Sequence, residues 1–368
     1  QMEVRRQKLG RLQHEGVVPY PNDFKVSHTS ASIRAQFAAL SDTQDRAEAR
    51  IFSLAGRVMA IRSFGKAAFF QLHDRSGSLQ VYARRDRLGE ADYERFRSFD
   101  LGDIIGVWGN LFRTKTGELT LEAHGLRLLS KCLRPLPEKW HGLADVETRY
   151  RQRYVDLMVN AEVKKVFELR SRIVRIVRRF FEEREFLEVE TPMMQPLPGG
   201  AAAKPFVTHH NALDLDLYLR VAPELYLKRL LVGGMERVFE LNRNFRNEGI
   251  SVRHNPEFTM LEFYQAYATY EDLMTLTEEL FGAVARDVAG SLTLSYGGSD
   301  ISLQARWRRL TMPAAIVEYG GAKETDLATL ESLRAFARAK GLQVDPALSH
   351  GKLLVEVFEQ VAEAHLEQ

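Results

Sequence analysis

The chain has 368 residues, of which 45% are hydrophobic and 27% are charged. This balance is typical of a globular protein, and the length suffices for two domains or one large one. Lys and Arg total 51 against 49 for Asp and Glu, so the net charge of +2 neither requires nor excludes binding to nucleic acid. The single cysteine, Cys132, excludes an internal disulfide framework and argues against a cysteine-based zinc site.

The sequence also bears on targeting and membrane insertion. It contains no run of about 18 apolar residues, so we expect no membrane-spanning helix. Gln1 to Gly16 is charged and helix-prone, and it lacks the apolar centre of a secretory signal. The low cysteine content fits a reducing compartment. We therefore expect a cytoplasmic protein.

The first 133 residues divide into a helical part and a strand-rich part. Residues 1–50 predict an N-terminal helical extension that is interrupted at Pro19–Asp23. In 51–133, turn residues separate five short strand-like runs, and one helix is predicted at Asp92–Phe99. The predicted strands are 52–58, 68–73, 79–82, 104–109 and 119–122. This count fits an OB-fold, a five-stranded barrel that often binds oligonucleotides, although other small barrels fit it too.

A linker is expected at 134–155, where Arg134–Pro137 is stiff and poor in secondary structure. A helix is predicted to start after Asn160, with apolar residues at helical spacing over about five turns. These apolar residues are Val163, Val166, Phe167, Ile173, Val174, Val177, Phe180 and Phe181. Five arginines lie largely off this stripe: Arg170, Arg172, Arg175, Arg178 and Arg179. We interpret them as a solvated face in preference to a nucleic-acid contact.

Residues 156–368 form the second predicted domain. Strands and helices alternate there without regular βαβ spacing, which indicates an α+β fold with a mixed or antiparallel sheet flanked by helices. The sequence contains neither G-x-x-x-x-G-K-[ST] nor G-x-G-x-x-G. If this protein binds ATP, it does not use those two phosphate-binding loops.

A predicted strand–loop–strand hairpin concentrates polar side chains. The run Val238–Arg246 alternates, so its apolar and polar residues lie on opposite faces of a strand. Its polar face carries Glu240, Asn242, Asn244 and Arg246, and Glu248 extends that set. A polar loop containing His254 and Asn255 leads to the returning run Phe258–Tyr264. Guanidinium groups bind phosphate and aromatic rings stack on bases, so this hairpin suits positioning and charge stabilisation more than nucleophilic attack.

Glu262 stands among apolar residues in the returning strand. A buried carboxylate requires a cation or strong hydrogen-bond donors. From the pattern alone, the plainer interpretation is an internal salt bridge to an arginine such as Arg243 or Arg246. The alternative is that a ligand brings the cation, with Tyr264 on the same face adding a hydrogen bond.

These segments carry a family resemblance. The run Phe245–Glu248 followed by Arg253–Phe258 resembles motif 2 of the class II aminoacyl-tRNA synthetases, and Phe186–Pro192 resembles motif 1. Three more segments are typical of the lysine-specific members: Gly199–Phe206, Thr208–Asn211 and Ala222–Lys228. The resemblance extends from about residue 5 to about residue 290.

The resemblance to class II lysyl-tRNA synthetases implies a lysine–tRNA ligase. Such an enzyme uses ATP to convert L-lysine to lysyl-adenylate, releases pyrophosphate, and transfers the lysyl group to the 3′ end of tRNA(Lys). Arg246 would be the catalytic residue, binding the α-phosphate of ATP and the lysine carboxylate. The implied ATP-binding residues are Arg246, Glu248, His254, Asn255 and Phe258. The implied lysine-binding residues are Gly200, Glu224, Arg246, Glu262 and Tyr264, with Glu262 and Tyr264 on the ε-ammonium group.

The resemblance also assigns the remaining parts. The OB-fold at 51–133 would read the anticodon through Arg57, Phe69 and Gln80, whereas Phe70 suits the barrel core. Pro192 would lie at the interface of a homodimer. Magnesium is expected with ATP, but its acidic ligands and motif 3 are not in this sequence. We therefore expect no metal site within the chain and a catalytic domain, 156–368, that is incomplete at its C-terminus, with the activity of the fragment alone left open.

Other functions compete with this interpretation. One is a lysyl-transferring paralogue that acts on a protein or lipid acceptor; the predicted OB-fold and the lack of apolar spans argue against it. Another is a non-catalytic nucleic-acid-binding protein, against which the intact Arg246, Glu248 and Glu262 argue. Aspartyl and asparaginyl relatives share the architecture, but an acidic pocket at Glu262 would repel aspartate and gain nothing from asparagine.

Overall fold

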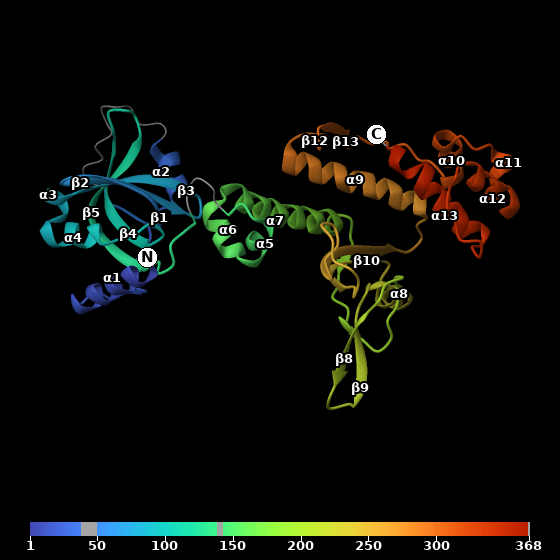
Figure 1. The fold of residues 1–368 in the computed structure, drawn as a ribbon, viewed down its shortest axis with the longest axis horizontal. Helices are drawn as coiled ribbons and strands as arrows, with labels where there is room; N and C mark the ends of the chain where they lie inside the picture. The colour runs from blue at the N-terminus through green and yellow to red at the C-terminus, as the bar shows by residue number, and fades with distance from the viewer. Residues whose placement is uncertain (38–49, 138–142, 367–368) are drawn as a thin grey trace. The chain divides into compact units, whose positions relative to one another are not determined.

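The computed structural model describes residues 1–37, 50–137 and 143–366 (Figure 1). The chain forms two compact units, 1–164 and 165–368. Parts of the predicted helical extension, 38–49, and of the predicted linker, 138–142, lie outside the described residues. The domain boundaries predicted from the sequence stay predictions.

The first unit is built on a closed five-stranded barrel in the order β1-β2-β3-β5-β4. Its strands are β1 (Phe52–Phe64), β2 (Ala67–Asp74), β3 (Gly77–Arg84), β4 (Ile104–Arg113) and β5 (Leu119–Ser130). β1 pairs antiparallel with β2 and with β4, and β3 pairs parallel with β5, which closes the barrel. The predicted barrel is therefore confirmed, with strands that run further than the sequence indicated.

Alternation along the strands fills the barrel, because every second side chain points inward. Phe70 of β2 is 1% exposed, as predicted for a core residue, and its ring packs on Phe96 with centroids 5.1 Å apart. Phe96 belongs to α4 (Glu90–Arg97), the predicted helix between the third and fourth strands, which follows the short α3 (Arg85–Leu88). α4 thus covers one end of the barrel core.

The N-terminal helices pack on this barrel. α1 (Met2–His14) and α2 (Ser30–Phe37) contribute Leu12, Ile33 and Phe37 to the barrel's own hydrophobic core. After the barrel, α5 (Val146–Arg151) and α6 (Arg153–Val159) complete the first unit. The described part of the predicted extension therefore contains two helices joined by a non-helical segment, 15–29, and three of its apolar residues belong to the barrel core.

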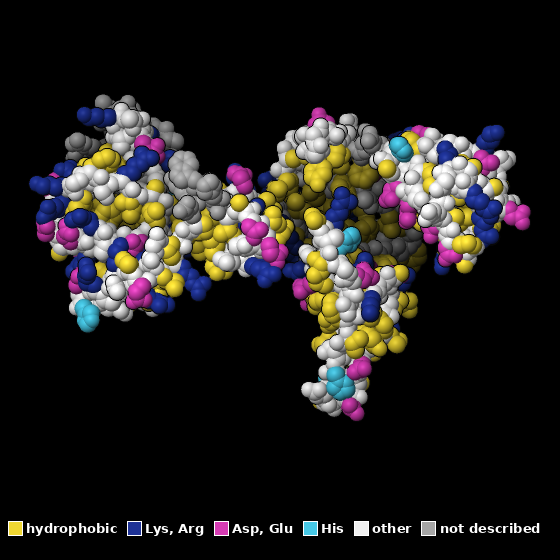
Figure 2. Space-filling model, viewed as in Figure 1, with side chains coloured by type: hydrophobic (Ala, Val, Ile, Leu, Met, Phe, Trp, Pro, Cys, Tyr) yellow, Lys and Arg dark blue, Asp and Glu magenta, His cyan; other side chains and the backbone are white. Residues whose placement is uncertain are grey.

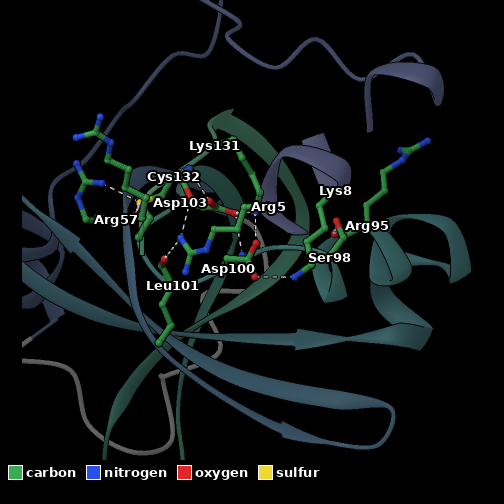
Figure 3. Close-up of polar contacts among 12 residues, drawn as sticks. Arg5, Lys8, Arg57, Arg95, Ser98, Asp100, Leu101, Asp103, Lys131 and Cys132 are labelled. Carbon is green, nitrogen blue, oxygen red and sulfur yellow. Dashed lines mark hydrogen bonds and ion pairs between the residues drawn. The ribbon is translucent and has the colours of Figure 1, made fainter. Parts of the chain in front are cut away.

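A buried ionic network attaches α1 to the barrel (Figure 3). The Lys131 side chain is fully buried, with its Nζ 2.6 Å from carboxylate oxygens of both Asp100 and Asp103. Lys8 of α1 donates to Asp100 at 2.6 Å, and Arg5 donates to the Cys132 carbonyl at 2.7 Å. Burial opposes ionisation of Asp100, but the hydrogen bonds from Lys131 and Lys8 lower its pKa. Two carboxylates therefore balance the buried lysine, as a buried charge requires.

The second unit contains the predicted mixed sheet. β10 (Arg237–Phe245) pairs antiparallel with β11 (Glu257–Gln265) and parallel with the two-residue β6 (Leu187–Glu188). Two long helices, α7 (Ala161–Glu182) and α9 (Tyr270–Ala289), supply its covering residues. Phe180 and Phe181 of α7 and Leu280 of α9 form one core with Phe239 of β10. The α+β class is confirmed.

The arginines of α7 mostly make intramolecular contacts. Arg172 and Arg179 both pair with Asp287 of α9, at 2.9 and 2.7 Å. Arg178 pairs with Glu188 of β6 at 2.9 Å. The sequence interpretation, a solvated face, missed that these cations join α7 to its neighbours. Val166 near the start of α7 is 63% exposed, so the predicted apolar stripe is buried mainly in its second half.

A second small sheet has the strand order β7-β9-β8, and helix α8 follows its last strand in the sequence. Its elements are β7 (Met194–Gln195), β8 (Phe206–His210), β9 (Leu215–Leu219) and α8 (Glu224–Val232). The β8–β9 hairpin carries hydrophobic side chains along its length and a histidine beside acidic side chains at its tip (Figure 2). There His209 lies 2.9 Å from Asp216 and 3.3 Å from Asp214.

The last part of the second unit has a hydrophobic cluster of its own. It follows the hairpin β12 (Thr293–Tyr296) and β13 (Ser299–Ser302). The cluster includes Ile316, Leu333, Leu353 and Val357, all fully buried. These residues belong to α10 (Met312–Gly320), α12 (Leu330–Ala339) and α13 (His350–Val361), which α11 (Glu324–Leu327) and a 3₁₀ turn, Glu363–His365, accompany.

Candidate functional site

The β10–β11 hairpin brings the predicted polar residues onto one face. In the antiparallel register, Glu240 lies opposite Glu262, and Val238 lies opposite Tyr264. Asn244 lies opposite Phe258 at the end of the hairpin where Arg246 follows. Directly opposed residues of antiparallel strands share a face of the sheet, so two carboxylates stand side by side here.

The first of these carboxylates is neutralised by the chain itself. Glu240 and Arg220 are each 1% exposed, and the Arg220 Nη1 lies 2.7 Å from the Glu240 Oε1. The hydroxyl of Thr191 donates to the other oxygen of Glu240 at 2.6 Å. Alternation along the strand predicts Glu240 on the polar face of the hairpin, and the structure shows that its carboxylate forms an internal ion pair there. Arg220, which follows β9, was not foreseen.

The second carboxylate has no such partner. Glu262 is half-buried and accepts a hydrogen bond from the Tyr264 hydroxyl at 3.3 Å. Among the described residues it makes no ion pair. Burial raises the pKa of its carboxyl above the ordinary value, and the Tyr264 hydrogen bond opposes that shift only in part. The predicted internal salt bridge to Arg243 or Arg246 is therefore wrong.

The two arginines named for that salt bridge are engaged elsewhere. Arg243 points away from Glu262, because adjacent strand residues face opposite ways, and its Nε lies 3.5 Å from Glu257. The guanidinium of Arg246 lies over the Phe258 ring, 5.2 Å from its centroid. The Arg246 Nε is buried and has no hydrogen-bond partner among the described residues. A buried unsatisfied donor of this kind suits an anion brought by a ligand.

Gly200 packs against Glu224, which lies close enough to Glu262 to act on its carboxylate. Gly200 has a φ of +87°, and a Cβ on it would come within 2.9 Å of the Glu224 Cβ. Only glycine fits this close approach and this backbone angle. Glu224, in the first turn of α8, pairs with Lys228 and also raises the pKa of Glu262 by its negative charge. The structure thus brings together four of the five predicted lysine-binding residues, Gly200, Glu224, Glu262 and Tyr264.

The remaining predicted nucleotide contacts are less closely assembled. Glu248 accepts a hydrogen bond from the Lys204 amide at 3.3 Å, which joins the loop after Gly200 to the end of the hairpin. His254 contacts Ser251 within its own loop, with 2.8 Å between the ring Nδ1 and the hydroxyl. His254 and Asn255 are exposed, and within the described part of the chain neither forms a hydrogen bond, ion pair or ring contact with Arg246 or Phe258. Pro192 accepts a hydrogen bond from the Gln195 side chain at 3.0 Å, and its interface role stays a prediction.

The structure offers no obvious place for a metal in its described parts. No group of three or more His, Cys, Asp or Glu residues in 1–37, 50–137 and 143–366 is arranged to hold one. Over the same ranges, no helix is both long enough and apolar enough to cross a membrane.

On the barrel, the predicted anticodon residues all lie on the outer face. Phe69 stacks on Tyr82, with centroids 4.4 Å apart and planes at 22°, so one side of its ring is already covered. The Gln80 side chain donates to Thr120 at 2.9 Å. Arg57 is opposite His73, four residues along the strand from Phe69, or roughly 13 Å. It donates to the Gly102 carbonyl at 2.7 Å (Figure 3).

A different arginine lies beside Phe69. Arg62 is its direct partner in the β1–β2 register. A β-bulge between Val58 and Ala60 changes which residues of β1 face outward, and simple alternation from Arg57 would have turned Arg62 inward. The structure therefore favours Arg62 over Arg57 as the cation next to the aromatic ring.

Comparison with known proteins agrees with this architecture. Residues 145–341 match the family of class II tRNA synthetases (D, K and N), and residues 52–129 match the OB-fold nucleic acid binding domain. The lysine–tRNA ligase of Moorella thermoacetica is 54% identical over 367 residues, covering 100% of this chain and 74% of that protein. The Escherichia coli lysine–tRNA ligase is 52% identical over 372 residues, covering 100% of this chain and 73% of its own length. With the synthetase sheet, the barrel and these relatives together, the chain belongs to the class II tRNA synthetases and, among them, to the lysine–tRNA ligases.

Proposed function

We propose that the second unit activates L-lysine with ATP and transfers the lysyl group to tRNA(Lys), whose anticodon the barrel reads. The observation that carries the choice of amino acid is Glu262, a half-buried carboxylate with a raised pKa and no ion pair among the described residues. The ionised form of a partly buried carboxylate without an ion pair is unfavourable in free energy unless a cation binds beside it. The ε-ammonium group of lysine is such a cation.

The lysine substrate would lie beside Gly200, Glu224 and Glu262. Its ε-ammonium group would contact Glu262, with the Tyr264 hydroxyl as a second oxygen. Its α-amino group would lie by Glu224, where the absence of a side chain at Gly200 leaves room. Two carboxylates on one small site suit a diamine, and they would repel the side chain of aspartate.

The chemical step requires charge stabilisation more than proton transfer. The lysine carboxylate attacks the α-phosphorus of ATP, the bond to the β-phosphate oxygen breaks, and pyrophosphate leaves. The guanidinium of Arg246, whose Nε lacks a partner in the described structure, would hold the α-phosphate and the carboxylate together. Phe258 would stack on the adenine, and Glu248, His254 and Asn255 would make further contacts with ATP.

In the second step, the terminal ribose hydroxyl of the tRNA attacks the lysyl carbonyl and AMP leaves. Magnesium would accompany ATP, as in the family generally, but the described residues provide no cluster for it. The barrel would position the tRNA through Phe69 and Gln80, with Arg62 or Arg57 as the nearby cation. We also propose that the protein forms a homodimer with Pro192 at its interface, and that it is located in the cytoplasm.

The decisive test is ATP–pyrophosphate exchange by the full-length protein with single amino acids. We expect exchange with lysine and none with aspartate, asparagine or no amino acid. Exchange that is independent of lysine, or that aspartate drives, would refute the assignment of Glu262. Transfer of the lysyl group to a protein or lipid in place of tRNA would support the paralogue function.

A further inference from the structure

A groove of about 630 Å³ lies on the outer face of the barrel, beside the ring that stacks on Phe69. Its lining includes Tyr82, Arg84, Arg87, Phe112, Glu122 and His124. They come from β3, β4 and β5 and from the short helix α3, so the groove crosses the strands that adjoin the proposed anticodon residues. A volume of this size is within the range of small-ligand sites.

Aromatic rings connect the groove to Phe69. Tyr82 contacts Phe69 on one side and Phe112 on the other, with ring centroids 4.4 and 5.9 Å away. Phe64, which is 63% exposed, contacts Phe69 from the other direction at 6.4 Å. A row of partly exposed rings on a barrel surface is the form of site that holds successive unpaired bases.

The charged residues of the groove suit a nucleotide as well. The Glu122 side chain is 19% exposed and lies 3.5 Å from Arg84 and 4.0 Å from Arg87. Two guanidinium groups therefore face one carboxylate in the lining. Arg87 is 56% exposed, so it can meet a phosphate without leaving a buried charge unpaired. Glu122 and the His124 ring supply hydrogen-bonding groups for the edge of a base.

We propose that this groove binds one further unpaired nucleotide of the tRNA, next to the anticodon, with its base on Phe112 and its phosphate towards Arg87. The proposal deepens the proposed function, because it rests on recognition of an anticodon loop by this barrel. It extends the base-binding surface beyond Phe69, Gln80 and the neighbouring arginine. The groove residues would then contribute to affinity for the loop independently of the anticodon bases.

The test is a cycle between protein variants and abasic RNA. The probe is a hairpin RNA whose loop presents the anticodon sequence UUU. Each derivative of this probe lacks one base, either within UUU or at a loop position beside it. The protein is the full chain, as wild type, Phe112→Leu or Phe69→Ala. Since stacking contributes about 1–3 kcal/mol per base, Phe112→Leu should weaken binding of the intact hairpin about five- to 150-fold. For one flanking abasic position, that loss should disappear, because the partner is already missing.

Two more variants keep the result independent of folding at position 112. Arg87→Gln should weaken binding and lower the slope of log affinity against log salt by about 1, as loss of one phosphate contact does. Arg97→Gln removes an equally exposed arginine of α4 that is not part of the lining, and it should change neither quantity.

The outcomes separate this proposal from the one it rests on. Coupling of Phe112 to a flanking base, with Phe69 coupled to a base of UUU, supports both. If Phe69 couples to UUU while Phe112 couples to no base and Arg87→Gln leaves the salt slope unchanged, the groove is not a nucleotide site and the proposed function survives. If neither Phe69 nor Phe112 couples to any base, the groove proposal and the proposed reading of the anticodon by the barrel are both refuted.

Discussion

Replacement of Glu262 by Gln isolates the charge in the proposed amino-acid pocket. Gln keeps the shape of the side chain and the hydrogen bond with Tyr264, but it removes the anion. In the wild type, burial raises the pKa of this carboxyl, so the free protein holds the charge at a cost. We expect the ammonium group of bound lysine to stabilise the ionised carboxylate. Glu262→Gln should remove this one interaction and no other.

The size of the effect follows from the kind of interaction lost. A hydrogen bond to a charged group contributes about 1.5–3 kcal/mol, which corresponds to about ten- to 150-fold in the lysine Km. The Km for ATP should stay close to the wild-type value, because the proposed site assigns Glu262 to the amino acid and not to the nucleotide. ATP–pyrophosphate exchange at saturating levels of the other substrate measures both constants.

Glu257→Gln is the matched control. Glu257 lies at the start of the same strand and is 55% exposed, with Arg243 as its partner. Its replacement should leave both Km values unchanged. An equal rise of the lysine and ATP Km values in Glu262→Gln, or no rise in either, would refute the placement of the ε-ammonium group on Glu262.

The raised pKa of Glu262 also gives a sign for the pH dependence. Above that pKa the carboxyl is ionised and binds lysine, so the lysine Km should rise as the pH falls through it, and Glu262→Gln should lack this rise.

The stability of the ligand-free protein should depend on pH in the opposite direction. The folded state binds this proton more tightly than the unfolded state does, so ionisation of Glu262 destabilises the free protein as the pH rises through the raised pKa. The ligand-free Glu262→Gln variant should therefore melt at a higher temperature than the wild type at neutral pH, and a lower melting temperature would contradict this.

Three other substitutions, each compared with a second one, test the rest of the structure. Arg220→Met leaves Glu240 buried without its cation and should cost about 3–5 kcal/mol in urea unfolding, whereas Arg243→Met, which removes an exposed pair, should cost at most about 1 kcal/mol; similar losses in the two would refute the role given to the buried pair. Gly200→Ala should raise the lysine Km because its Cβ would meet Glu224 at 2.9 Å, whereas Gly298→Ala strains a similar φ of +89° in open space and should leave the lysine Km unchanged; a rise in both would point to a general loss of stability. Phe69→Ala should reduce tRNA charging without changing lysine-dependent exchange, whereas Phe70→Ala should cost about 3–5 kcal/mol in stability; loss of exchange in Phe69→Ala would place Phe69 in the core.

The barrel and the hairpin could be predicted because their signals are local. Alternation with period two, separated by Gly and Ser turns, marks each strand, and it also assigned Phe70 to the inside and Phe69 to the outside. The β10–β11 hairpin followed from the same alternation. Alternation cannot predict a β-bulge, which shifts the pattern by one residue. The bulge at Val58 to Ala60 therefore hid Arg62, which sequence reasoning passed over in favour of Arg57.

The errors at the site have a different physical origin. Whether a carboxylate finds a cation depends on which distant residues fold beside it, and this is not a local property of the sequence. Glu240 and Glu262 occupy similar positions in their strands. Arg220, twenty residues before Glu240, forms an ion pair with Glu240 and none with Glu262. Sequence reasoning considered only arginines of the same hairpin, so it predicted a salt bridge for the wrong glutamate. The other possibility it raised, a cation brought by a ligand, stays a prediction.

The attachment of α1 to the barrel has a consequence for how the first unit comes apart. Leu12 is inside the barrel core, and Lys8 shares Asp100 with the fully buried Lys131. Melting of this helix would open the apolar interior and leave Asp100 with one cation fewer. Backbone amides of α1 should therefore exchange with deuterium at rates set by opening of the whole barrel, and proteases should cut elsewhere before they release this segment.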